Sequence, residues 1–158
     1  MTTPAAPQQP PQFVPLTELK LTPEIKEAIN GALANRTPVM VAYVDEEGQP
    51  SLSFRGSTQA YSDTQLAIWA RNPEGGLQRA LAKNNRISLF YRDPEKRMTL
   101  QFKGKGHIES DQATRDKVYN SAPEPERNAD REMKGLALIV DLHQVDGVMP
   151  GVRVQMRP

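Results

Sequence analysis

The stretch Leu66-Ala-Ile-Trp-Ala-Arg-Asn-Pro-Glu-Gly-Gly-Leu-Gln-Arg-Ala-Leu81 combines a short apolar run, a Pro/Gly break and a helical pattern. It predicts a strand, a turn, and a helix that begins just after Gly75 and Gly76. The free amides and the dipole at the start of a helix attract anions. Arg71 and Arg79 add fixed positive charge on either side of the turn. The stretch therefore predicts a site for a phosphorylated small molecule.

The overall composition excludes several classes of protein. The chain has 158 residues, no cysteine, two histidines and a net charge of +1. The absence of cysteine rules out disulfides and thiolate chemistry, and two histidines predict no metal centre. The balanced charge argues against nucleic acid or an anionic membrane as the main partner. Without a membrane-length apolar run or a secretory signal, we expect a soluble, cytoplasmic protein.

The chain divides into a tail and one domain. Residues 1–20 are rich in proline and glutamine and predict a disordered or polyproline-like tail. Residues 21–158 predict a single domain that is long enough to bury a core. This domain opens with a helix that Thr22 caps and Pro23 starts, and the helix is expected to end near Asn35.

The rest of the chain follows mostly the two-residue period of strands. Strands are predicted over residues 39–44, 50–61, 66–70, 86–91, 98–108 and 136–145, with helices over 76–84 and 111–133, the latter interrupted near Pro123 and Pro125. Most of the strands are linked as hairpins, which favours an antiparallel sheet closed into a small barrel. The predicted fold class is mainly β with short helices (α+β).

Arg55 is the first candidate binding residue outside the opening stretch. The alternation over 50–61 places Arg55 with Ser51, Ser53, Ser57 and Gln59 on one face, opposite Leu52 and Phe54. A row of hydroxyl and guanidinium groups binds phosphate through charge-assisted hydrogen bonds, although an exposed sheet face has the same pattern.

Two further features leave alternatives open. Trp69 either stacks on an aromatic ring or, as its position favours, packs in the core. The basic residues Arg97, Lys103, Lys105 and His107 form either an oligonucleotide surface or, as we favour, a solvated barrel face. No hydrolase triad and no protein acid or base stand out.

The order of these motifs resembles the pyridoxamine 5′-phosphate oxidase-like, FMN-binding split-barrel family. The resemblance covers roughly residues 22–146. It rests on Pro38-Val-Met-Val-Ala-Tyr-Val-Asp-Glu-Glu-Gly-Gln-Pro50, the Arg55 strand, Trp69-Ala-Arg-Asn-Pro-Glu-Gly-Gly-Leu-Gln-Arg79, Asn85-Arg-Ile-Ser-Leu-Phe-Tyr-Arg-Asp-Pro94 and Lys103-Gly-Lys-Gly-His-Ile-Glu109.

The resemblance implies an antiparallel split β-barrel that forms a homodimer with FMN in clefts between the subunits. It implies that the cofactor-binding residues are Arg55, Ser57 and Thr58, the strand end Trp69, Ala70 and Arg71, the helix start Gly75, Gly76, Leu77 and Gln78, and Thr99 or Gln101 from the partner.

The chain also departs from authentic pyridoxamine phosphate oxidases. Ala60 stands in place of a lysine, Gly76-Leu77 in place of an Arg-Lys pair, and the C-terminal substrate segment has no match. The resemblance therefore points to the broader FMN-binding relatives, and to an FMN-dependent oxidoreductase of an unidentified small molecule with NADH or NADPH as a candidate donor. The alternatives are a deazaflavin-dependent reductase, with Lys103 and Lys105 along the cofactor's acidic tail, and a module that holds a flavin or another phosphorylated ligand without turnover.

Overall fold

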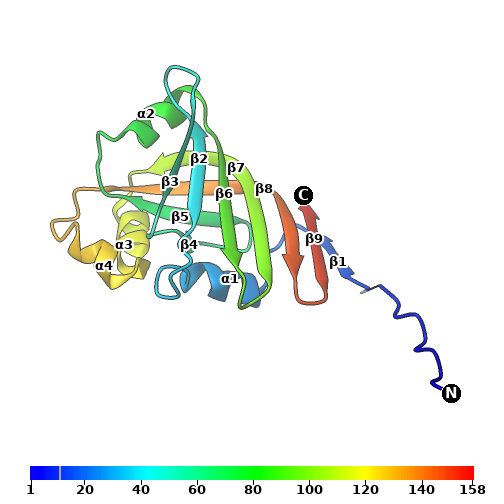
Figure 1. Cartoon of the computed structure of the whole chain (residues 1–158). Coiled ribbons are helices and arrows are strands. Elements are labelled where there is room, and N and C mark those ends of the chain that lie inside the picture. The colour runs from blue at the N-terminus through cyan, green and yellow to red at the C-terminus, as the bar shows by residue number, and fades with distance from the viewer. Residues whose placement is uncertain (11) are drawn as a thin grey trace.

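A computed structural model describes residues 1–10 and 12–158 (Figure 1). The elements follow in the order β1 (Val14–Glu18), α1 (Pro23–Asn30), β2 (Met40–Val44), β3 (Pro50–Phe54), β4 (Gln59–Ala60), β5 (Gln65–Ala70), α2 (Gly76–Lys83), β6 (Arg86–Asp93), β7 (Met98–Glu109), α3 (Gln112–Ser121), α4 (Glu124–Asn128), β8 (Leu136–Met149) and β9 (Val152–Arg157). The predicted class, mainly β with short helices, is confirmed.

The nine strands of the described residues form one sheet. Seven of them follow one another in the order β1-β9-β8-β7-β6-β2-β3, and β4 and β5 lie off this path. β8 is long enough to pair with β7 along one edge and with β5 and then β9 along the other. β4 pairs with β5, and every pairing is antiparallel except that of β1 with β9. Within residues 1–10 and 12–158 no pairing joins β3 to β4 or β5, so the barrel is split and does not close.

The main core lies inside the curved sheet and is sealed at one end by α1. Thr22 caps α1, because its Oγ1 accepts a hydrogen bond from the Ile25 amide at 3.3 Å, and Pro23 occupies the first turn. The apolar side of α1 (Ile25, Ala28 and Ile29) is fully buried against strand residues such as Leu100 and Phe102. The predicted start of the helix is confirmed; its regular part ends at Asn30 rather than near Asn35, and a turn continues to Arg36.

A second, smaller core forms on the outer side of β5 and β8 under α3. It contains Ala67 and Trp69 from β5, Ala137 and Ile139 from β8, and Val118 from α3. The helical region predicted over 111–133 is indeed broken near its prolines into α3 and α4. These two helices cover one part of the outer sheet surface and leave the part over β3, β2 and β6 bare (Figure 1).

The strand predicted over residues 50–61 is wrong as a continuous element. It ends at Phe54, the chain turns at residues 55–58, and a short β4 follows. Thr58 closes this turn, since its amide and its Oγ1 both reach the Arg55 carbonyl oxygen, at 3.1 and 2.7 Å. The turn breaks the predicted alternation, so Ser57 and Gln59 are buried instead of sharing a face with Ser51.

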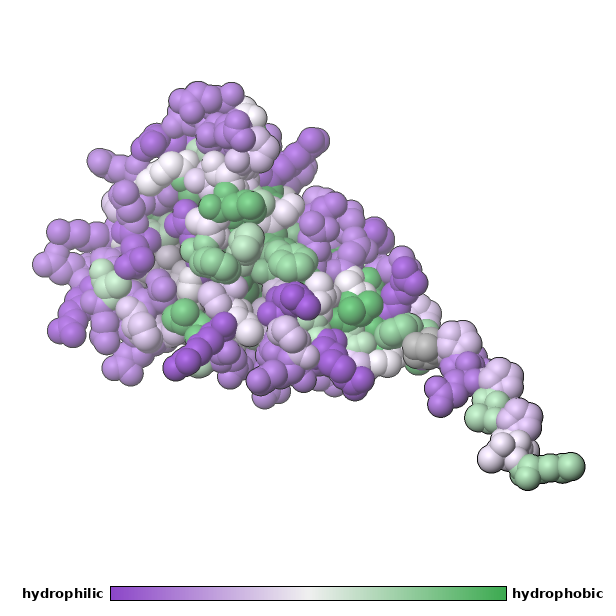
Figure 2. All heavy atoms as spheres, in the orientation of Figure 1, coloured by the Kyte–Doolittle hydropathy of each residue, from purple (hydrophilic) through white to green (hydrophobic). Residues whose placement is uncertain are grey.

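Leu52 and Phe54 lie on the outer side of β3, where their side chains are 69% and 63% exposed. The register places Phe54 opposite Met40, and Met40 opposite Phe90, which is 40% exposed. We call Leu52, Phe54, Met40 and Phe90 the apolar patch. Figure 2 shows hydrophobic side chains gathered over β2, β3 and β6 on this face.

The predicted tail is wrong for residues 14–18. They form β1, which pairs in parallel with β9 and extends the sheet by an edge strand; the Val14 amide donates to the Gly151 carbonyl oxygen at 3.0 Å. The hairpin of β8 and β9 was not predicted, because the Pro/Gly pattern after residue 145 suggests only a tail. Residues 1–10 and 12–13 carry no regular structure, and Pro11 lies outside the described residues.

Candidate functional site

The turn after β3 and the end of β5 enclose a groove of about 380 Å³ that α4 borders. We call it the Arg55 groove. Its lining consists of Phe54, Arg55, Gly56, Ser57, Trp69, Arg71, Asn72 and Glu126. Four of the twelve predicted cofactor-binding residues meet here: Arg55, Ser57, Trp69 and Arg71.

The two arginines reach the groove from different strands. Arg55 follows the last residue of β3, and its Nε donates to the Ser53 Oγ at 3.1 Å. Arg71 follows the last residue of β5, and its side chain is 52% exposed. A guanidinium keeps its charge at any physiological pH and matches the geometry of a phosphate. The pair therefore gives the groove a positive wall suited to a phosphate group.

The hydroxyl groups of Ser57 and Thr58 are bonded to the backbone of Trp69 and Arg55 rather than free to act as donors to a ligand. The Ser57 Oγ donates to the Trp69 carbonyl oxygen at 3.0 Å and accepts from the Trp69 amide at 2.9 Å. The Thr58 hydroxyl is bonded to the Arg55 carbonyl oxygen. Among the described residues the backbone amides of Gly56 and Ser57 meet no acceptor, so the turn offers amides, not hydroxyls, to an anion.

Trp69 packs in the second core, as its position favoured. Its side chain is only 2% exposed, its Nε1 donates to Asp130 Oδ2 at 2.8 Å, and Tyr119 meets its ring edge-on at a centroid distance of 5.2 Å. The guanidinium of Arg115 lies 5.6 Å from the ring centroid, within cation–π range. Ala70 is buried as well, at 1% exposure. Trp69 lines the groove, whereas Ala70 does not.

Asp130 connects this core to the loop before β8. Burial opposes ionisation of Asp130, but hydrogen bonds from the Gly135 and Lys134 amides and from the Trp69 indole outweigh it and hold its pKa below the ordinary value. The charged carboxylate therefore stabilises the folded position of Trp69.

Glu126 was not predicted to belong to the site. It comes from α4, and its Oε2 lies 3.5 Å from the Arg71 Nε with 18% of the side chain exposed. A Cβ on Gly56 would lie 2.5 Å from Glu126 Oε1, so any larger residue at this position would displace the carboxylate. A glycine inside a strand pattern indicates that another group lies close to the backbone at that position. The sequence alone does not identify that group as Glu126. A negative charge thus sits among the cations of the groove.

The start of α2 does not line the Arg55 groove. Gly75 caps the helix without a side-chain bond from any described residue, Leu77 is buried in the core, and the Gln78 amide group donates to the Asn72 carbonyl oxygen. The charge of Arg79 is already matched, since its Nε lies 2.8 Å from Glu46 Oε1. The phosphate-binding role of Gly75, Gly76, Leu77 and Gln78 remains a prediction.

Thr99 and Gln101 lie on the outer face of β7, away from this groove. Gln101 is exposed and pairs with Phe90, and the register leads on through Met40 to Phe54 at the groove edge. Three strand spacings of about 4.8 Å therefore separate Gln101 from Phe54. Neither residue can therefore reach the Arg55 groove of its own chain. Such a position agrees with the expectation that a partner subunit supplies Thr99 or Gln101.

The Arg55 groove suits the phosphate of FMN in most of its polar groups. Arg55, Arg71 and the amides of Gly56 and Ser57 match that group, and the negative charge of Glu126 opposes it.

No helix among the described residues is long and apolar enough to cross a membrane. Among the residues that the structure describes, no group of three or more His, Asp or Glu side chains is arranged to hold a metal ion.

Comparison with solved structures places the fold. HupZ of Group A Streptococcus has a TM-score of 0.64 at 20% identity, covering 84% of this chain and 97% of that one. An FMN-binding protein from Syntrophomonas wolfei subsp. wolfei has a TM-score of 0.57 at 10% identity, with 77% and 84% covered. An F420 reductase has a TM-score of 0.54 at 18% identity, with 70% and 89% covered. At these identities the likeness concerns the fold, one that flavin-binding proteins share.

The sequence comparison is more specific. No curated protein matches the chain. Residues 21–141 match the family described as Pyridoxamine 5'-phosphate oxidase, which is most of the chain and includes both arginines of the groove. The resemblance stated from the motifs is thereby confirmed: the chain belongs to the pyridoxamine 5′-phosphate oxidase family, on the split-barrel fold that its FMN-binding members share.

Proposed function

We propose that the protein is a homodimeric oxidoreductase that binds FMN and acts on a small molecule. The observation that carries the proposal is the meeting of Arg55 and Arg71 in one groove, at two positions where the family resemblance expects the cofactor. The name of the Syntrophomonas wolfei neighbour, an FMN-binding protein, supports the same cofactor.

In this proposal the chain binds and orients the cofactor. Arg55 and Arg71 hold the phosphate through charge-assisted hydrogen bonds, and the amides of Gly56 and Ser57 add neutral donors. Bound FMN supplies hydride or electron transfer, with NADH or NADPH as the proposed donor in the cytoplasm. The departures at Ala60 and Gly76-Leu77 leave these two arginines as the main cations of the site.

Two observations support the proposed homodimer: the exposed apolar patch, and the distance between Gln101 and the Arg55 groove within one chain. Leu52 and Phe54 expose 69% and 63% of their side chains beside each other on a bare sheet face. Large apolar groups rimmed by polar residues mark interaction surfaces. A second copy of the chain buries the patch through an isologous contact and brings its own Thr99 or Gln101 to the Arg55 groove.

The test is a visible spectrum of the purified protein followed by a titration with FMN. We expect flavin absorbance, or saturable quenching of flavin fluorescence, and an affinity that falls about tenfold or more in Arg55→Gln because a charge-assisted contact is lost. Lys20→Gln, an exposed cation remote from the groove, is the matched control. A protein that neither carries nor binds FMN would overturn the proposal.

The F420 reductase among the neighbours supports a second candidate cofactor, a deazaflavin. Parallel titrations with FMN and a deazaflavin decide between them by affinity. A third candidate, a module that holds a flavin without turnover, is separated by anaerobic reduction: bound flavin that neither NADH nor NADPH bleaches identifies the module, and bleaching identifies the reductase.

A further inference from the structure

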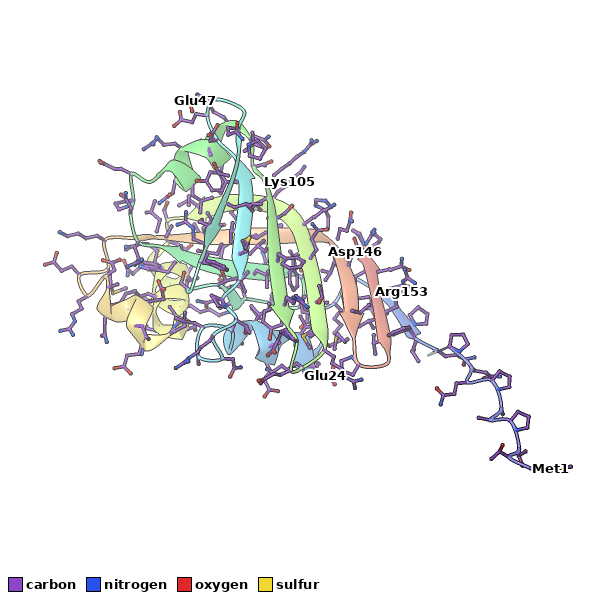
Figure 3. The ribbon with its side chains drawn as sticks, in the orientation of Figure 1. Met1, Glu24, Glu47, Lys105, Asp146 and Arg153 are labelled. Atoms are coloured by element: carbon purple, nitrogen blue, oxygen red, sulfur yellow. The ribbon has the colours of Figure 1, made fainter. Side chains whose placement is uncertain are left out.

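A second concave surface lies at the opposite end of the bare sheet face, near the hairpin of β2 and β3. This groove of about 880 Å³ has an apolar side formed by Ala42, Val44 and Pro50 over the buried Ile87 and Leu142, and a cationic side formed by Arg86, Lys103 and Lys105, with His143 beside them. We call it the basic groove. Figure 3 shows Lys105 near the top of the sheet and Glu47 at the tip of the hairpin above it.

The concavity is built into the backbone. The pairing of β7 with β8 shifts between Lys103, which is opposite Gln144, and Gly104, which is opposite Leu142. His143 is therefore an extra residue, a β-bulge that turns its side chain toward the groove. A Cβ on Gly104 would lie 2.3 Å from a backbone oxygen of β8, so the bulge depends on glycine. Bulges of this kind re-aim side chains and are frequent next to functional sites.

The cations of the groove form no ion pair with the described residues. Arg86 and Lys105 are direct cross-strand partners on β6 and β7, and like charges in that position repel. Among the described residues, Arg86, Lys103 and Lys105 have no carboxylate within 4 Å. The arrangement keeps three positive charges together without a partner on the same chain.

The acidic side chains around the groove are engaged elsewhere. Glu46, from the hairpin, pairs with Arg79 at 2.8 Å and with Lys83 at 3.3 Å on α2. Asp141, in the wall of the groove, accepts a hydrogen bond from the Gln65 amide at 2.8 Å and lies 3.2 Å from a ring nitrogen of His107. Glu46 and Asp141 therefore contact groups other than the cations of the groove, although the register places Asp141 opposite Lys105.

Asp146, farther along β8 toward β9 (Figure 3), is bonded to Arg157 at 3.0 Å. Burial opposes its ionisation, but the bonds from Arg157 and Gln144, with a smaller attraction from Lys103, hold its pKa below the ordinary value. It belongs to the pair with Arg157 and does not line the basic groove.

We propose that the basic groove is a binding site for a small molecule in which a phosphate or carboxylate group is attached to an apolar body. The three cations meet the anionic group, and Ala42, Val44 and Pro50 cover the apolar body. The basic groove shares no residue with the Arg55 groove. The two grooves of one chain can therefore be altered separately by substitution, and the proposal does not require that the chain binds FMN.

The test is a fluorescence titration of the full chain at low ionic strength with 1-naphthyl phosphate and, separately, with 1-naphthoate. The double variant Arg86→Gln/Lys105→Gln is compared with Arg92→Gln/Lys96→Gln, which removes two exposed cations elsewhere on β6 and its turn. We expect saturable binding of at least one probe, and a loss of affinity of about tenfold or more only in the first variant. The probe that binds more tightly identifies phosphate or carboxylate as the preferred group.

Two controls separate this site from the cofactor site. Arg55→Gln/Arg71→Gln lowers FMN affinity and leaves the probe affinity unchanged, whereas Arg86→Gln/Lys105→Gln does the reverse. Absence of saturable probe binding overturns the proposal, as does an equal loss in the two cation pairs or a loss confined to the Arg55→Gln/Arg71→Gln variant. Thermal unfolding of each variant checks that the change in affinity is not a loss of folded protein.

Discussion

At the scale of single residues, Glu126 decides how strongly the Arg55 groove attracts an anion. Its carboxylate lies 3.5 Å from the Arg71 guanidinium, at a place where a phosphate would compete for the same cation. Its partial burial makes the interaction less screened than in an exposed pair. The sequence offered Arg55 and Arg71 as candidates, and only the contact with α4 shows that one of them already has a partner.

We therefore expect Glu126→Gln to bind FMN about three- to tenfold more tightly than the unmodified chain, because the amide keeps the shape of the side chain and removes its negative charge. Titration of flavin fluorescence measures the change. Glu124→Gln, in the exposed first turn of the same helix, serves as the control and leaves the affinity as it was. Weaker binding in Glu126→Gln would contradict competition between the carboxylate and the phosphate.

Asp130 makes a second prediction at this scale. Its pKa is lowered in the fold, so its contribution to stability is complete above the ordinary value of 3.8 and is lost as the pH falls through the folded-state pKa. Asp130→Asn removes the charge that the amides of Gly135 and Lys134 stabilise, and we expect a loss of about 1 kcal/mol in the free energy of unfolding at pH 7.

Urea unfolding of both proteins between pH 3 and pH 7 measures this effect. The difference between Asp130→Asn and the unmodified chain is expected to be largest near neutral pH and to shrink below about pH 4. A difference that stays constant over this range would show that the carboxylate contributes through packing rather than through its charge.

At the scale of elements, β1 is the edge strand that the sequence assigned to a tail. Its parallel pairing with β9 depends on residues 14–18, and Leu16 and Leu19 pack against the main core. Val14-Pro-Leu-Thr-Glu18 contains a proline and follows a proline-rich run, and these local features favour an extended, unpaired chain. The strand forms because the β8–β9 hairpin, more than a hundred residues later, presents an open edge.

Truncation separates the two parts of the tail. Removal of residues 1–12 is expected to leave the Tm unchanged, whereas removal of residues 1–20 deletes β1 and lowers the Tm by about 4–8 °C, as expected for a loss of about 2 kcal/mol. Differential scanning calorimetry of both truncated proteins measures the shift. Equal Tm values would show that β1 contributes nothing to the stability of the domain.

At the scale of the whole molecule, the arrangement of surfaces on the bare sheet face is the main result. The apolar patch lies between the Arg55 groove, which borders Phe54, and the basic groove, which borders Ala42 and Pro50. Covering the patch with a second copy therefore brings partner residues toward the proposed cofactor. Assembly and cofactor binding are expected to depend on each other.

Leu52→Glu/Phe54→Glu tests that dependence. We expect a molar mass of twice 17.6 kDa for the unmodified protein by light scattering, 17.6 kDa for the variant, and a fall of tenfold or more in FMN affinity. Phe13→Glu, an exposed aromatic outside the patch, is the control and stays dimeric. An unmodified protein of 17.6 kDa would overturn the proposed homodimer.

Elements with local signals could be predicted from the amino-acid sequence. The cap at Thr22 and Pro23, the alternation in β6 and β7, and the Pro/Gly break before α2 each act over a few residues, so the class of fold and most element positions could be predicted. The order of the motifs was enough to indicate the family. Arg71 was found as a candidate because a strand end followed by a Pro/Gly turn is recognisable in the chain itself, and Arg55 because it lies in a row of polar residues on a predicted strand.

Which of these candidate residues come together depends on tertiary packing. The turn at residues 55–58 buries Ser57, Trp69 packs under α3, and Glu126 reaches Arg71 from 55 positions later in the chain. The outward position of Leu52 and Phe54 and the bulge at His143 likewise depend on strand pairing. Such contacts arise from the way distant segments pack, a free-energy balance of the whole fold, and no pattern within a short window of sequence specifies them.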